Sequence, residues 1–195
     1  MAVLPGRFIG RTLTGMVLVL AITGCAASGA VNSAPKSRAH RSIVSVPLAI
    51  HGYNYTNRYI GYFKVDSVGG GNIYVSGPDS GGGGTTCCAS YTKGAGSWKA
   101  KVNWQTGACR WGEVVQKSGE TVFSLHNYYK TVEVDVDPRI PRDPKHLEVH
   151  FYPDGTVQIA LTEEESPPRL VLSTDREDKS PSPQCPGNTQ PVRVW

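Results

Sequence analysis

The chain has 195 residues, of which 39% are hydrophobic and 18% are charged, a composition typical of a globular protein with one domain. The formal net charge of +4 is modest and is not concentrated in a basic cluster, which argues against a nucleic-acid-binding protein.

The N-terminus has the pattern of an exported lipoprotein. Arg7 and Arg11 precede a mostly apolar stretch at residues 13–22, which is shorter than the roughly 20 residues that span a bilayer. The residues ITGC that follow resemble a bacterial lipobox ending at Cys25. We therefore expect residues 1–24 to be a signal peptide and Cys25 to be lipidated; an ordinary signal peptide followed by an incidental cysteine is the alternative.

Residues 25–42 are predicted to be the lipid anchor and a flexible tether. They are small and polar and show no apolar periodicity. A coil of this length reaches roughly 20–25 Å. Ala26 follows the cysteine, where an aspartate would favour retention at the inner membrane. By analogy with Gram-negative lipoproteins, we expect an outer-membrane lipoprotein that faces the periplasm.

The four remaining cysteines are Cys87, Cys88, Cys109 and Cys185, an even number that predicts two disulfides in an oxidising compartment. A bond between the neighbours Cys87 and Cys88 would close a strained ring. We therefore expect each of them to bond one of the other two, which would tie the C-terminal tail to the domain. A redox-active or metal-binding role is the competing interpretation, but the chain has no C-x-x-C motif.

The first half of the domain is predicted to form short strands. Pro47 should limit residues 42–50 to an edge strand or two short pieces. Residues 59–65 and 72–76 predict a hairpin around a glycine-rich turn. Residues 77–86 are expected to be a loop that either allows close backbone approach or is mobile at a partner-binding edge. They lack the lysine and Ser/Thr that a phosphate loop requires.

Two longer strands are predicted next. Residues 98–104 place two tryptophans on one face of a half-buried strand, where aromatic side chains fill a core more often than they bind carbohydrate. Residues 121–136 form a second strand. Its valines should point inward and its acids should form an outer stripe that faces water rather than calcium. The valines are Val132, Val134 and Val136, and the acids are Glu133, Asp135 and Asp137.

A hairpin is predicted at residues 146–161, with a turn at residues 153–155. Leu147, Val149 and Phe151 should face the core together with Val157, Ile159 and Leu161. His146, Glu148 and His150 share the other face. We expect that face to be solvated rather than to hold zinc, because ligands spread along a strand diverge.

No segment after residue 24 shows a helical apolar period. The pattern predicts an all-β, antiparallel β-sandwich-like single domain at residues 43–173, which could include a short helix. A proline-rich C-terminal tail should follow at residues 174–195.

Several segments, taken in order, resemble the bacterial lipoproteins called domain of unknown function 3304. They are HGYNYTNRYI at residues 51–60, GGN at 70–72, SGGGG at 80–84 ahead of Cys87 and Cys88, and YPDG at 152–155. The resemblance covers roughly residues 45–165. Members of this family often occur beside type VI secretion components and lipase effectors. The resemblance therefore implies an immunity protein that inhibits such an effector.

The leading hypothesis is thus a non-enzymatic protein that binds a secreted effector and is held at the membrane by its lipid. The chain contains no G-x-S-x-G or H-E-x-x-H motif, and we expect no catalytic residues, cofactor or metal. The alternative is an envelope structural or assembly lipoprotein that binds another periplasmic protein or a glycan. The candidate partner contacts are Tyr53, Tyr55, Gly82, Gly83, Glu133 and Asp135.

Overall fold

The computed structural model describes residues 44–191 of the chain. The predicted signal peptide (1–24), the lipidation site Cys25 and the tether (25–42) lie outside these residues. Within the described part, no helix is long and apolar enough to cross a membrane.

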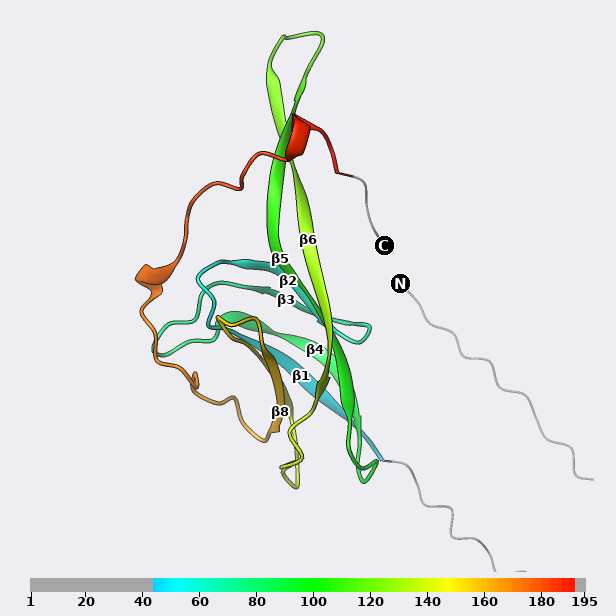
Figure 1. The fold of residues 1–195 in the computed structure, drawn as a ribbon. Helices are drawn as coiled ribbons and strands as arrows, with labels where there is room; N and C mark the ends of the chain where they lie inside the picture. Colours follow the sequence, from blue (N-terminus) through cyan, green and yellow to red (C-terminus); the bar gives the residue numbers. More distant parts are fainter. Residues whose placement is uncertain (1–43, 192–195) are drawn as a thin grey trace, which may run out of the picture. The chain divides into compact units, whose positions relative to one another are not determined.

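The described residues form one curled sheet of eight strands, in the order β6-β5-β2-β3-β4-β1-β7-β8 (Figure 1). The strands are β1 (Ser45–Asn54), β2 (Ile60–Val65), β3 (Val68–Ile73), β4 (Gly82–Thr92), β5 (Lys99–Val114), β6 (Thr121–Asp135), β7 (His146–Phe151) and β8 (Val157–Thr162). Two single-turn 3₁₀ helices follow, η1 (Thr174–Arg176) and η2 (Pro186–Asn188). The all-β prediction is confirmed.

The sheet differs in detail from an antiparallel sandwich. One pair of neighbours, β1 and β7, is parallel, so the sheet is mixed. The two edge strands approach each other where an isolated bridge joins Val136, just after β6, to Ile159 of β8. A single sheet thus curls around its own core and does not need a second sheet to cover it.

The core lies on the concave side of this sheet and is apolar. The predicted β7–β8 hairpin is confirmed, with Leu147 opposite Leu161 and Val149 opposite Ile159. These side chains pack with residues from the other strands, because alternate strand positions point to one face. The buried contributors from β1 to β5 are Leu48, Ile50, Ile60, Phe63, Val65, Ile73, Ala89, Tyr91, Ala100, Val102 and Trp104.

β1 is a central strand rather than an edge strand, which corrects the prediction made from Pro47. β4 pairs with β1 from Ser45 onward, whereas β7 pairs with it only from Ala49 onward. Pro47 therefore lies in the part of β1 that has a neighbour on one side only. The rule that excludes proline from the middle of a sheet holds locally, although the strand continues into the centre.

Two glycine segments predicted as turn or loop are strand. β3 begins at Val68, within the segment expected to be a turn. A side chain at Gly70 would overlap the ring of Phe63, so glycine at this position lets β2 and β3 close over that ring. β4 begins at Gly82, within the segment expected to be a loop. Glycine weakens a strand in isolation, but here it allows close packing between neighbouring backbones.

The predicted disulfide pairing is wrong. The bonds join Cys87 to Cys88 and Cys109 to Cys185. β2 and β3 separate β4, which holds the first pair, from β5, which holds Cys109. The C-terminal segment instead runs along β5, where the amide of Cys185 donates to the carbonyl of Arg110. The Cys109–Cys185 bond does tie the tail to the domain, as expected.

Candidate functional site

A layer of buried polar side chains lies on the face of β1 opposite the apolar core. His51, Tyr53 and Tyr55 alternate with core residues along the chain, and β7 places Glu148 beside His51 and His150 beside Tyr53. Tyr53 and His150 are 0% exposed, and Tyr55 and Glu148 are 1% exposed. We call His51, Tyr53, Tyr55, Glu148 and His150 the polar cluster.

The burial of this cluster corrects two predictions. Tyr53 and Tyr55 are not available to a partner in this structure, because their rings stack against His150 inside the fold. The face of β7 that was expected to be solvated is buried at Glu148 and His150, and only His146 remains partly exposed.

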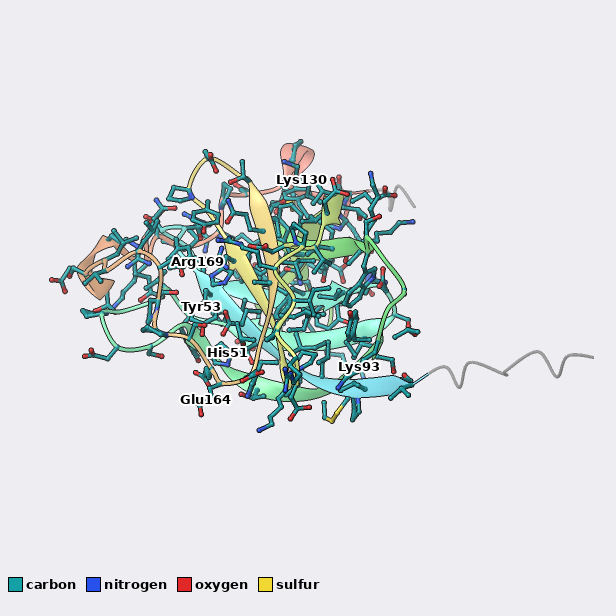
Figure 2. The ribbon with its side chains drawn as sticks, turned by 90° about the horizontal axis from the view of Figure 1, so that it is seen from below. His51, Tyr53, Lys93, Lys130, Glu164 and Arg169 are labelled. Atoms are coloured by element: carbon teal, nitrogen blue, oxygen red, sulfur yellow. A yellow bond between two sulfur atoms is a disulfide. The ribbon has the colours of Figure 1, made fainter. Side chains whose placement is uncertain are left out.

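The chain's own C-terminal segment, residues 163–176, covers the polar cluster. The amide of Ser166 donates to Glu148 at 2.7 Å, and the Ser166 carbonyl accepts from the hydroxyl of Tyr53. The amide of Arg169 donates to the hydroxyl of Tyr55 at 2.8 Å. In Figure 2, His51 and Tyr53 project from β1, and the segment that carries Glu164 and Arg169 crosses the same region.

Arg176 binds the far end of residues 163–176, which we call the covering segment, to the sheet. Its guanidinium donates to the carbonyl of Ser76 at 2.7 Å and to the carbonyl of Asn54 at 3.0 Å. Arg58 forms an ion pair with Asp178 at 2.6 Å just beyond. An alternating strand pattern assumes that one face meets water, and it could not show that a distant segment of the same chain would cover that face.

Burial and hydrogen bonding shift the pKa values of Glu148 and His150 in opposite directions. Burial alone would raise the pKa of Glu148, but hydrogen bonds from His150 and Ser166 outweigh burial and lower the pKa to about 2. Burial lowers the pKa of His150 despite its contact with Glu148. Burial also raises the pKa of Tyr53, whose hydroxyl is protonated at neutral pH with or without this shift. Glu148 is therefore the charged member of the cluster.

A chain of hydrogen bonds fits a neutral His150. Its Nδ1 lies 3.1 Å from the hydroxyl of Tyr55, which already accepts from the amide of Arg169. The Tyr55 hydroxyl can then donate to Nδ1, and Nε2, which lies 3.5 Å from Glu148, carries the proton toward the carboxylate. The contact between Nε2 and the carboxylate is an electrostatic one, because at 3.5 Å it does not meet the geometry of a hydrogen bond.

His51 connects the cluster to the surface. Its Nδ1 lies 3.3 Å from the hydroxyl of Thr85, and its Nε2 lies 3.2 Å from a carboxylate oxygen of Glu165, whose side chain is 49% exposed. Burial lowers the pKa of His51 although Glu165 raises it. The cluster holds groups capable of acid–base chemistry, but residues 163–176 cover them. In this arrangement the cluster binds the C-terminal segment to the sheet.

Zinc was the alternative considered for His146, Glu148 and His150. Within residues 44–191, no group of three His, Cys, Asp or Glu side chains is arranged to hold a metal ion. Glu148 directs one oxygen to Ser166 and the other toward His150, so its acceptor sites are used within the fold.

Gly82 and Gly83 lie where the backbones of β3 and β4 come close together. Gly82 has a φ of +94°, and a side chain there would collide with the carbonyl of Tyr74. Gly83 pairs with Ile73, and a Cβ would lie 3.2 Å from the carbonyl oxygen of Asn72. Two roles were predicted for residues 77–86, close backbone approach or mobility at a partner-binding edge. The contacts of Gly82 and Gly83 fit close backbone approach.

Glu133 and Asp135 of the acidic stripe are exposed as predicted, whereas Asp137 is partly buried, and the charges of the stripe are balanced locally. Lys99 lies 3.4 Å from Glu133 and 3.6 Å from Asp135. Asp137 pairs with Arg139 at 2.6 Å, and hydrogen bonds from Arg139 lower the pKa of Asp137 to about 2. These cations leave little net negative charge with which to attract a basic partner.

The distal halves of β5 and β6 form a projecting hairpin, residues 107–129, which we call the arm. Figure 1 shows it extending beyond the ends of the other strands. Seven large apolar side chains on or beside it are between 41% and 65% exposed. They are Val114, Val115, Val122, Phe123, Leu125, Tyr128 and Tyr129.

Sequence reasoning identified the strand at residues 121–136 but missed the exposed apolar surface. A signal was present: Val122 and Phe123 are adjacent, as are Tyr128 and Tyr129, so apolar side chains fall on both faces of the strand. A strand with one buried face would have alternated throughout. The base of the arm is secured by the Cys109–Cys185 bond and by the side chain of Asn188, which accepts from the amide of Gly112 at 2.9 Å.

The model of the family described as protein of unknown function (DUF3304) matches residues 53–159. The chain belongs to this family. No curated protein and no solved structure matches the chain significantly.

The DUF3304 match begins near the end of β1 and ends within β8. It thus contains the arm, most of the polar cluster, and both Cys87 and Cys88. It does not contain the covering segment or Cys185, so the contacts that close the polar cluster in this DUF3304 chain come from residues beyond the matched region.

Proposed function

We propose that this chain is a non-enzymatic binding protein that inhibits a secreted effector of the type VI, lipase-like kind, and that a lipid on Cys25 holds it at the outer membrane facing the periplasm. The family resemblance supplies the class of partner. The observation that supports a protein-binding role is the arm, which carries exposed apolar side chains on an edge strand.

The arm has the features of a protein-binding edge. β6 is the first strand in the sheet order, so one side of its backbone is free to pair with another strand. Proteins usually protect such edges with lysine, proline or acids, and residues 121–129 contain none of these. An added strand would gain backbone hydrogen bonds from this edge and specificity from side chains such as Phe123 and Leu125.

The rest of the fold suits an inhibitor. The Cys109–Cys185 bond and the hydrogen bond from Gly112 to Asn188 hold the base of the arm in one arrangement, which reduces the entropy lost on binding. A tether at the membrane would concentrate the inhibitor where a lipid-degrading effector acts. The local balance of charge at Glu133 and Asp135 makes the acidic stripe a weaker candidate contact than the arm.

The test is affinity capture with a matched pair of variants. The mature chain carrying Cys25→Ser is expressed in the periplasm of the native host, alone or with Leu125→Lys or Val171→Lys. Leu125 lies in the arm and is 61% exposed, whereas Val171 is 74% exposed and lies in the C-terminal segment, so each change adds the same charge to an exposed apolar site.

We expect an effector to co-purify in equimolar amount with the parent chain and with Val171→Lys, and its activity to be blocked in the complex. Leu125→Lys should lose at least tenfold in affinity, because it buries a charge against an apolar partner. Recovery of envelope proteins alone, with no effector bound when candidates are supplied, would overturn the proposal. Equal binding by the two lysine variants would remove the arm as the contact.

A further inference from the structure

A cleft of about 240 Å³ lies between the β1–β2 connection, the middle of β5 and the β7–β8 turn. Residues 56–60 form one wall and residues 151–153, 155 and 156 form another, so segments far apart in the sequence meet here. Both lie within the region that matches the family. The remaining lining residues are Trp104, Gln105, Thr106 and Lys130.

Aromatic side chains form much of the cleft. Trp104 is buried and packs against Phe151 with ring centroids 5.6 Å apart, which gives the cleft a rigid apolar floor. Tyr59 is 42% exposed and Tyr152 is partly exposed, so part of each side chain is open to a ligand. The hydroxyl of Tyr152 donates to Gln158 at 3.2 Å, which holds its ring in place. A mostly apolar pocket with a few placed polar groups is the usual form of a small-molecule site.

The charge of the lining is positive. It contains Arg58 and Lys130 and no carboxylate. Arg58 is neutralised by Asp178, to which it donates twice, at 2.6 Å and 2.9 Å. Lys130 takes part in none of the ion pairs found among residues 44–191. Its ammonium lies 5.6 Å from the centroid of the Trp104 ring, above the floor of the cleft.

The turn at residues 153–155 keeps this cation accessible. Asp154 is the acid within this turn, but its carboxylate accepts from the amide and hydroxyl of Thr156 and is not part of the lining. Gly155 has a φ of +81°, and a Cβ there would lie 3.7 Å from the ammonium of Lys130. The turn therefore lies beside the cation without neutralising it.

We propose that this cleft binds a saccharide that carries a carboxylate. Lys130 receives the carboxylate, and the rings of Tyr59 and Tyr152 contact the apolar face of a sugar ring. The amides of Asn57 and Gln105 and the hydroxyl of Thr106 lie among the lining groups that can bond sugar hydroxyls. One free ammonium suits a monoanion, whereas phosphate is usually held by a free arginine fork or a nest of backbone amides. The inference does not depend on the proposed inhibition of an effector.

The test is titration of the mature Cys25→Ser chain with glucuronate and N-acetylmuramic acid, and with the neutral sugars glucose and N-acetylglucosamine. Binding is measured by calorimetry and by amide chemical-shift changes. Lys130→Met removes the charge from the cleft, and Lys93→Met is the matched control. Lys93 is exposed, as Lys130 is, and it lies well apart from Lys130 in Figure 2.

We expect the acidic sugars to bind with shifts at residues 56–60 and 152–156, and at least tenfold more tightly than the neutral ones, as a charged hydrogen bond implies. Lys130→Met should abolish that preference, and Lys93→Met should retain it. Tyr59→Ala should weaken the binding of acidic and neutral sugars alike. The absence of shifts in the cleft at millimolar sugar would overturn the proposal. Acetate or inorganic phosphate binding as tightly as the acidic sugars would also overturn it, because the cleft would then recognise an anion only.

Discussion

Replacing Glu148 by glutamine would remove the one charge that the polar cluster buries, and the structure predicts the size of the loss. Glu148 is 1% exposed and accepts from the amide of Ser166 at 2.7 Å and from the hydroxyl of Thr162 at 3.1 Å. The difference between its ordinary pKa of 4.5 and its pKa of about 2 in the fold corresponds to about 3 kcal/mol. Glutamine keeps an acceptor oxygen, so we expect Glu148→Gln to lower the free energy of unfolding by about 2–3 kcal/mol at pH 7.

The loss should depend on pH in a defined direction. Because folding lowers the pKa of Glu148, the unfolded chain binds the proton more readily than the folded chain does. The stabilisation is therefore complete above about pH 5 and is lost as the pH falls toward 2. Glu148→Gln resembles the protonated state, so the parent and variant stabilities should converge across this window.

Urea denaturation of the oxidised mature chain at pH 7, 5 and 3 measures this difference. Glu164→Gln is the matched control, because Glu164 is exposed and lies in the same covering segment that closes the cluster. The control should change the free energy of unfolding by less than about 0.5 kcal/mol. A difference between the parent and Glu148→Gln that stays below about 1 kcal/mol at pH 7, or that does not shrink by pH 3, would refute the electrostatic account of the cluster.

Two further predictions use the same denaturation assay. Replacing Cys109 and Cys185 together by serine should cost about 4 kcal/mol, because the bond joins residues 76 apart in the sequence, and an unchanged midpoint would contradict this. Peptide mapping of the parent should recover these two cysteines in one linked fragment. Gly82→Ala should destabilise by about 2 kcal/mol or more, because of its positive φ and the collision with the carbonyl of Tyr74. Gly84→Ala has open space around the added methyl and should be close to neutral; equal effects of the two glycine changes would count against the close approach of β3 and β4.

The local pattern of the sequence was sufficient for the strands whose two faces differ. Residues 146–161 alternate on both sides of a proline–aspartate–glycine turn, and the β7–β8 hairpin forms in the expected register. The tryptophan strand and the inward valines of β6 were predicted for the same reason. Alternation records a difference between core and solvent, so it identifies a strand wherever that difference exists.

The polar cluster and the cleft could not be predicted in this way. Glu148 and His150 are polar residues on the second face of β7, and local pattern alone assigns such a face to solvent. They are buried because Ser166 and Arg169 return across the sheet, and a contact of that kind depends on how the chain folds back rather than on any local spacing. The pairing of Cys109 with Cys185 is decided by the same return of the C-terminal segment.

The sequence by itself thus determined the all-β class, the family and the positions of most strands, because these follow from side-chain periodicity and from short ordered motifs. Only the tertiary structure decided which polar groups are buried, which cysteines meet and which apolar residues are left uncovered on the arm. Burial and disulfide pairing are properties of neighbours in space, and in this chain the decisive neighbours are supplied by residues 163–188, which return across strands β1, β5 and β7.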